Sequence, residues 1–206
     1  MAITSIKTGS SFTNLVKYND FLAGNPSFIP SSYESIATVT ASGGQTSLSF
    51  TSIPSTYVSL QIRGLYRDTD TFGFSRQLGI TFNSDSGTNK YAYHGLQGDG
   101  SSATALGSAA GFISQMFTVG SGTDSGMDAS CFGASIIDIH DYVSTSKNKT
   151  MRCFAGAIDN VSNTNRRMGL SSGVWLNTSA VTSIQLNAAN AFVAGSTFAL
   201  YGIKGA

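Results

Sequence analysis

The chain has 206 residues and a formal net charge of +1, with 11% charged residues against 41% hydrophobic ones. Because no basic run is longer than the pair at residues 166–167, the sequence lacks the electrostatic footprint of a nucleic-acid-binding protein. The longest apolar run is far shorter than the roughly 20 residues of a membrane-spanning helix, and the first residues lack the apolar region of a secretion signal, so we expect no membrane partner and synthesis in a cytoplasm.

Residues 1–33 carry the helix-like pattern of the sequence, since Phe12, Leu15, Val16 and Asn19 are spaced as i, i+3, i+4 and i+7. Ser10 or Ser11 is suited to cap the start of this helix, and Gly24 is suited to end it. A helix this short is stable only when it is packed, so its apolar side chains are candidates for an anchoring interface. These candidates are Phe12, Leu15, Val16, Tyr18 and Phe21. Their partner stays open between an external surface, such as a capsid or a neighbouring copy, and the rest of the chain itself.

Residues 34–206 are a succession of short strand signals separated by turns rich in Gly, Ser, Asn and Asp. The predicted strands are residues 34–40, 46–51, 56–64, 77–82, 89–94, 112–118, 130–140, 149–158, 168–176, 182–187 and 196–203. Short strands with no helical pattern between them predict an all-β fold, an antiparallel β-sandwich of jelly-roll type. Residues 98–111 and 119–128 are rich in small residues and are predicted to be loops. The sequence thus divides into an N-terminal arm or short helix over residues 1–33 and a sandwich over residues 34–206.

Three of the predicted strands indicate which side chains face the core, because apolar residues alternate with polar or small ones. The side chains predicted to face inward are Val58, Leu60 and Ile62 in one strand, Ile184 and Leu186 in another, and Phe198 and Leu200 in the last. Each of these strands is therefore expected to present its other face away from the core.

Cys131 and Cys153 are predicted to be free, mostly buried thiols. They fall on two strands of one hairpin whose turn is centred near Thr145, a register that sets Cys153 opposite Ile137. Cys131 then lies about 20 Å away along the strand, which exceeds the limit of about 7 Å between the Cα atoms of a disulfide. Two reduced thiols are in keeping with assembly in a cytoplasm.

The segment from Phe82 to Tyr91 superficially resembles a calcium-binding loop, because it places oxygen-bearing side chains at Asn83, Asp85 and Asn89. An EF-hand would have a bidentate glutamate at the twelfth position of the loop, where this chain has His94. The segment is therefore interpreted as a hairpin turn in which Asp and Asn bond the backbone. The two histidines and two cysteines lack the spacing of a zinc site, and we predict neither a metal nor a cofactor.

Asp138, His140 and Asp141 suggest acid–base chemistry, since a carboxylate beside an imidazole tunes its pKa. On a strand, however, Asp138 and His140 share one face while Asp141 points to the other. We interpret this cluster as a solvated strand end and predict no catalytic residue.

Trp175 is the only tryptophan, and together with Tyr66, Tyr91 or Tyr93 it is a candidate for a sugar-stacking platform. A single tryptophan that follows S-S-G-V in a strand more often fills a core or an interface. The core is therefore the preferred location of Trp175.

Five segments of the sequence carry a resemblance to a known family. They are F-T-S-I-P-S-T-Y (Phe50–Tyr57), L-G-I-T-F-N-S-D (Leu78–Asp85), I-I-D-I-H-D-Y with K-N-K-T (Ile136–Thr150), S-G-V-W (Ser172–Trp175) and G-S-T-F-A-L-Y-G-I-K (Gly195–Lys204). In order and approximate spacing they resemble a family of virion structural proteins of tailed bacteriophages. The resemblance covers about residues 34–204 and implies a jelly-roll-like sandwich on the outside of the particle, with no catalytic residue to carry over.

Members of that family are variously described as capsid decoration, fibre or tail-associated proteins. A tail fibre usually has a long shaft, whereas only residues 1–33 of this chain lie outside the predicted sandwich. The expected function is therefore that of a non-enzymatic capsid decoration or cement protein on the outer surface of the head, made in the cytoplasm of the bacterial host. Its expected partners are the major capsid protein or other virion proteins and further copies of itself, with a trimer favoured.

The alternative function is a head-fibre or tail-appendage adhesin that binds a host-surface glycan. Such a protein would use the predicted loops at residues 67–76, 94–111 and 119–128. A glycan-degrading enzyme would need two carboxylates roughly 5 to 10 Å apart in a cleft, and the sequence proposes no such pair.

Overall fold

The computed structural model describes residues 32–69, 76–113, 116–120, 129–158 and 166–204. The chain divides into two compact units, Met1–Ser32 and Tyr33–Ala206, and the second holds the strands. The predicted helix and the anchoring candidates Phe12, Leu15, Val16, Tyr18 and Phe21 lie outside the described residues. Within the described ranges, there is no helix of the length and hydrophobicity needed to cross a membrane.

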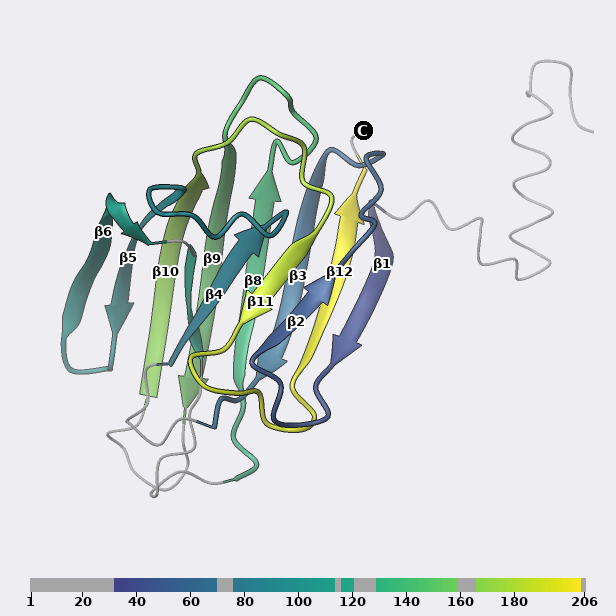
Figure 1. Ribbon diagram of the computed structural model, residues 1–206. Coiled ribbons are helices and arrows are strands. Elements are labelled where there is room, and N and C mark those ends of the chain that lie inside the picture. The colour runs from purple at the N-terminus through teal and green to yellow at the C-terminus, as the bar shows by residue number, and fades with distance from the viewer. Residues whose placement is uncertain (1–31, 70–75, 114–115, 121–128, 159–165, 205–206) are drawn as a thin grey trace, which may run out of the picture. The chain divides into compact units, whose positions relative to one another are not determined.

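Twelve strands are found among the described residues (Figure 1). They are β1 Tyr33–Thr40, β2 Ser47–Phe50, β3 Ser59–Tyr66, β4 Arg76–Phe82, β5 Tyr91–Gly98, β6 Ala103–Ile113, β7 Met116–Gly120, β8 Gly133–His140, β9 Lys149–Ile158, β10 Arg166–Trp175, β11 Ile184–Asn187 and β12 Thr197–Ile203. Eight of them form a large sheet in the order β1-β12-β3-β8-β9-β10-β5-β6, and four form a small sheet in the order β2-β11-β4-β7. All pairings are antiparallel, and the small sheet lies across one face of the large one, so the predicted antiparallel sandwich is confirmed.

The core lies between the two sheets and is rich in aromatic side chains. The largest fully buried side chains are Trp175, Tyr66, Tyr91, Tyr142, Phe82, Lys149, Phe192 and Phe198. Six of the seven side chains predicted to face inward are buried, namely Leu60, Ile62, Ile184, Leu186, Phe198 and Leu200. Their alternation with exposed or half-buried neighbours is the expected pattern of strands that bury one face.

Val58 is the exception, because it is 63% exposed while its neighbour Tyr57 is buried. Strand β3 begins only at Ser59, so the alternation that runs through Leu60 does not extend back to Val58. The Tyr57 ring instead lies against Gly202 of β12, where a Cβ atom would come within 2.3 Å of it. The prediction for Val58 is therefore wrong, since the Tyr57 ring takes the inward position.

The prediction of a loop at residues 98–111 is also wrong, because most of this segment forms β6, which pairs with β5. Small residues give this segment little intrinsic preference for a strand, but the backbone of β5 offers it a hydrogen-bonding edge. The connecting turn is fixed by Asp99, whose carboxylate accepts hydrogen bonds from the backbone N–H groups of Ser101 and Ser102 at 2.8 and 2.7 Å. The segment thus cannot serve as the long glycan-binding loop that the adhesin alternative assumed.

The hairpin of β8 and β9 has the predicted register. Cys153 lies opposite Ile137 and is buried, whereas Cys131 precedes β8 and is half-buried. Neither cysteine forms a disulfide, as the register predicted.

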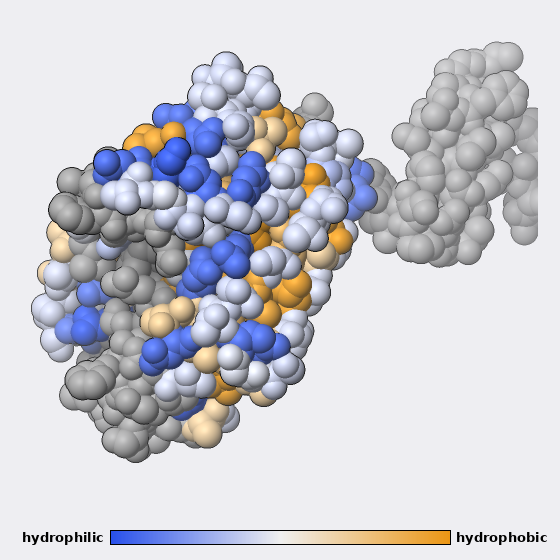
Figure 2. Space-filling view, in the orientation of Figure 1, coloured by the Kyte–Doolittle hydropathy of each residue, from blue (hydrophilic) through white to orange (hydrophobic). Residues whose placement is uncertain are grey.

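The outer face of the small sheet is polar. Gln185 accepts a hydrogen bond from Thr81 at 3.4 Å and donates one to Ser47 at 3.3 Å, and Asn187 donates to Thr81 at 3.5 Å. Figure 2 shows this face, over β2, β11 and β4, as largely hydrophilic and neutral, with hydrophobic residues scattered among them. This face is therefore suited to contact with water.

Candidate functional site: the outer face of the large sheet

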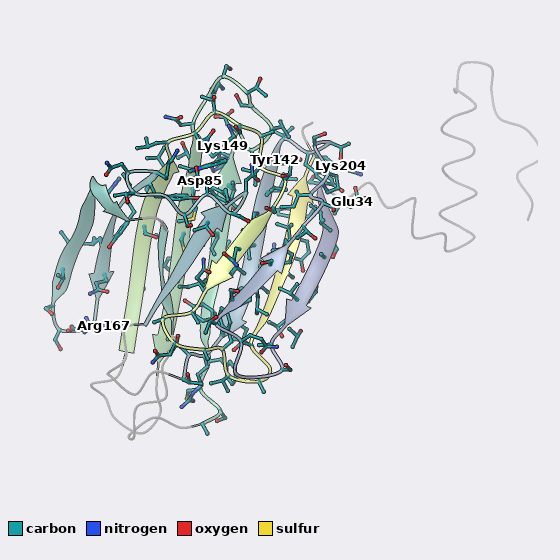
Figure 3. All side chains as sticks on the ribbon, viewed as in Figure 1. Glu34, Asp85, Tyr142, Lys149, Arg167 and Lys204 are labelled. Carbon is teal, nitrogen blue, oxygen red and sulfur yellow. The ribbon has the colours of Figure 1, made fainter. Side chains whose placement is uncertain are left out.

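Several buried polar groups lie at one end of the sandwich, where Figure 3 shows Tyr142, Lys149 and Asp85. The Tyr142 hydroxyl donates a hydrogen bond to the carbonyl of Pro54 at 2.6 Å and accepts one from the backbone N–H of Tyr57 at 3.1 Å. At the end of β10, the indole N–H of Trp175 donates to a carboxylate oxygen of Asp85, in the loop after β4, at 2.9 Å. Each of these bonds joins segments that are distant in the sequence.

The five segments that carry the sequence resemblance meet through these contacts. Tyr142 joins the third segment to the first, and Asp85 joins the second to Trp175 in the fourth. Trp175 also pairs with Lys149 across β9 and β10, and the fifth segment reaches the first where Gly202 lies under Tyr57. The characteristic residues of the resemblance therefore hold the sandwich together at one end.

Lys149 is the least expected of these groups, because a lysine is almost never fully buried unless it is paired, and this one is 0% exposed. Its ammonium group donates to three backbone carbonyls, those of Ser144 and Lys147 at 2.6 Å and that of Thr178 at 2.9 Å. Burial lowers the pKa of Lys149, and the charge of Asp141 acts in the opposite direction. Because an ammonium has three protons to donate, this arrangement uses all of them for structure.

The loop that resembled a calcium site uses its oxygen atoms within the chain. The side-chain oxygen of Asn83 accepts from the backbone N–H groups of Thr182 and Ser183 at 2.8 and 3.1 Å, and its amide donates to the carbonyl of Ala180 at 2.7 Å. Asp85 bonds Trp175, as described above. Among the described residues no group of three or more His, Cys, Asp or Glu side chains is placed to hold a metal ion.

Acid should weaken the junction between Asp85 and Trp175. Burial alone would raise the pKa of Asp85, but hydrogen bonds from Trp175 and Asn177 and the nearby Lys90 give it a net lowered pKa. A carboxylate whose pKa is lower in the folded chain stabilises the fold above its unfolded pKa of about 3.9 and loses that contribution as pH falls through the folded value.

We therefore expect the free energy of unfolding to fall as the pH is lowered below about 4, with a smaller fall in Asp85→Asn, which keeps an acceptor but does not titrate. Unfolding followed by the fluorescence of the single tryptophan measures this directly. Equal acid dependence in the parent and in Asp85→Asn would contradict the assignment.

The suggested acid–base cluster is divided among other partners. Asp138 and His140 do share the outer face of β8, as predicted, but Asp138 accepts hydrogen bonds from Gln61 at 2.8 Å and from Arg152 at 3.1 Å. Asp141 follows the strand with a φ of 55° and pairs with Lys147 at 3.1 Å. The carboxylates are thus paired with an amide and with cations.

Trp175 is buried in the core, as predicted. It is 1% exposed and lies stacked on Tyr91 with ring centroids 6.4 Å apart. Tyr66 is buried as well, beside Phe198. These rings cannot form the sugar-stacking platform considered from the sequence.

The outer face of the large sheet carries a band of exposed apolar side chains that sequence reasoning missed. Ile136, Phe154, Leu170 and Leu96 are directly opposite one another on β8, β9, β10 and β5, and together form a continuous row. Leu65 of β3 and Met168 of β10 belong to the adjacent row. We call these six residues the apolar band; their exposed fractions lie between 44% and 56%.

The apolar band borders two hollows in the sheet surface. The first, of about 730 Å³, arises where the adjacent row has small residues at Ala134, Gly156 and Gly98 between larger neighbours. The second, of about 660 Å³, lies on the other side of the row, toward Asp138 and Arg152. Phe154 and Leu170 border both hollows and form a ridge between them.

Strand β10 explains why the band was missed. Its large apolar residues Met168 and Leu170 point outward, whereas Gly169, Ser171 and Gly173 point inward and are buried. Strand β8 of the same sheet carries apolar residues on both faces, as in the pair Ile136–Ile137. Adjacent apolar residues within a strand are the signal that could have predicted the band, because they leave neither face polar.

The function of the chain has to be inferred from its own residues and contacts. Neither a scan against protein-family models nor searches of curated proteins and of solved structures find a match to this chain.

Proposed function

We propose that the chain is a non-enzymatic structural protein of a tailed-bacteriophage virion, a decoration or cement protein on the outer surface of the head. The observation that carries this proposal is that the five resembling segments contact one another at one end of a single sandwich. The buried polar groups of these segments form hydrogen bonds that stabilise the sandwich, as expected of a protein whose role is mechanical.

The order of the strands supports a jelly-roll version of the sandwich. If β5, β6, β9 and β10 are set aside, the two sheets read β1-β12-β3-β8 and β2-β11-β4-β7. The chain then passes from one sheet to the other at every step except between β4 and β7. This is the pattern of two four-stranded sheets wound as a jelly roll, a fold common among capsid proteins. The four remaining strands extend the large sheet.

Residues 1–24 provide the proposed attachment to the major capsid protein or another virion protein, through Phe12, Leu15, Val16, Tyr18 and Phe21. We expect that removing residues 1–24 leaves the sandwich folded and abolishes binding to particles. Quantitative mass spectrometry of purified virions gives the copies of this chain relative to the major capsid protein. Circular dichroism of the purified truncated chain verifies the fold.

A matched pair of variants tests the same attachment without a deletion. Replacing Phe12, Leu15 and Val16 with serine should reduce the copies per virion at least about tenfold, since each removes buried apolar area. Replacing the neighbouring polar residues Thr13 and Asn14 with alanine should leave the number unchanged. Hundreds of copies of the parent chain would support decoration, whereas a handful would favour a vertex or tail appendage and the glycan-binding alternative. Wild-type copy numbers of the truncated chain would refute the assigned role of residues 1–24.

A further inference from the structure

We propose that two copies of this chain pair through the outer faces of their large sheets, with the apolar bands in contact across a two-fold axis. Six of the nine exposed large hydrophobic side chains among the described residues belong to the band, and the opposite face of the sandwich is polar. One face is thus suited to water and the other to a partner. Contact of one surface with the same surface of a second copy is isologous and closes at two copies.

The area of the band fits a protein partner. Six side chains about half exposed, with roughly 200 Å² each when fully exposed, present roughly 600 Å² of apolar surface, the upper limit of what monomeric proteins usually leave in water. The adjacent Ala134, Gly156 and Ala105 lie in the same rows and extend it. A stable interface needs about 800 Å² on each partner, of which roughly two thirds is apolar in homodimers, so about 500 Å² of apolar surface is sufficient and the band supplies it.

Two of the three arginines beside the band form ion pairs within the chain. Arg152 contacts Asp138 at 3.1 Å on one side of the row, and Arg167 contacts Asp99 at 3.9 Å on the other. Figure 3 shows Arg167 near the end of β10 opposite to Lys149. The third arginine, Arg63, lies opposite Ile136 on β3, donates a hydrogen bond to Gln61 at 2.9 Å and lies over the rings of Tyr33 and Tyr201. The face therefore carries only a small excess of positive charge, at one end of the row, which an identical face can keep outside the contact.

The shape of this face allows it to pack against the same face of a second copy. The ridge of Phe154 and Leu170 rises between the two hollows, and the floor of the larger hollow is made by Ala134, Gly156 and Gly98. Two identical faces related by a two-fold axis can each place their ridge in a hollow of the other. Such packing gives an interface the complementarity that a flat apolar surface lacks.

The experiment is sedimentation equilibrium of the purified full-length chain. We expect a mass of twice 21.5 kDa for the parent chain. Leu170→Glu places an unpaired charge in the proposed contact and should weaken pairing by about 100-fold or more. Val58→Glu changes a side chain that is also exposed but lies outside the band, and should leave pairing unchanged. Both positions are exposed in the single chain, so circular dichroism should show two folded variants.

A second variant tests the hollow without adding charge. Ala134→Gln fills the larger hollow from an exposed position and should weaken pairing at least about tenfold, because an overfilled contact cannot close. If Leu170→Glu fails to fold, Ala134→Gln still tests the proposed pairing. A parent chain that stays monomeric at about 100 μM, a trimeric mass, or pairing that neither variant weakens would each overturn the proposal.

Sedimentation equilibrium measures pairing of the purified chain in the absence of virions. A monomeric result would therefore refute the pairing without contradicting the proposed capsid role. If the parent chain is monomeric and Leu170→Glu nevertheless lowers the copies per virion, the band contacts another virion protein and self-pairing is refuted. If the chain pairs in solution but is missing from virions, the capsid role fails and the pairing stands.

Discussion

Replacing Lys149 with methionine should lower the free energy of unfolding by about 3 kcal/mol or more, one of the largest effects expected of a single substitution in this chain. Methionine occupies a similar volume but donates no hydrogen bond. The carbonyls of Ser144, Lys147 and Thr178 would then lose the donor that joins them. Urea unfolding followed by circular dichroism measures the change.

Lys147→Met is the matched control, because the same substitution is made two residues away on a side chain that is 65% exposed. Lys147 loses only its ion pair with Asp141, and such exposed pairs are worth about 0 to 1 kcal/mol. If both variants lose the same small amount, the three bonds of Lys149 do not stabilise the fold as inferred.

Replacing Gly202 with alanine should lower the free energy of unfolding by about 2 to 3 kcal/mol, because the added methyl group overpacks the core. Its Cβ would lie 2.3 to 2.4 Å from three carbons of the Tyr57 ring, including the one that joins the ring to the rest of the side chain. The ring cannot easily move away, since the Tyr57 backbone N–H is held by Tyr142. Thermal and urea unfolding measure the loss.

Gly156→Ala serves as the control for Gly202→Ala, since both glycines lie within strands. At Gly156 a Cβ would meet only the carbonyl of Arg167, at 3.4 Å. We expect a change within about 1 kcal/mol, since alanine also restricts the unfolded chain. Adding Tyr57→Ala to Gly202→Ala should cost less than the sum of the two single changes, because the clash and the lost ring involve the same space. Full additivity would show that the ring is not what excludes a side chain at position 202.

Much of the fold could be predicted from alternation within single strands. Strand β9 begins and ends at the predicted residues, and a turn centred near Thr145 correctly placed Cys153 opposite Ile137. Both results follow from local rules: a strand repeats every two residues, and a hairpin turn sets the register of its two strands. These rules need no knowledge of the rest of the chain.

The features that were not predicted depend on contacts between distant strands. Strand β6 is made mostly of small residues and is a strand because β5 offers it an edge. Strand β10 alternates as a strand should, but alternation does not decide which face is buried, and here glycines and serine face inward. The apolar band depends on four strands being in register at Ile136, Phe154, Leu170 and Leu96, which no single segment of sequence encodes.

The position of β12 has a consequence for how the protein is made. In the sheet, β12 is the only neighbour of β1 and also pairs with β3, yet about 130 residues separate it from β3 in the chain. At a synthesis rate of about 5 to 20 residues per second, β1 and one edge of β3 wait on the order of ten seconds for their partner. During that interval these strand edges can bind chaperones or pair with wrong strands. The insertion of β12 between β1 and β3 is itself slow, because it joins segments that are far apart in the sequence. Folding of this sandwich should therefore be completed only after β12 has left the ribosome.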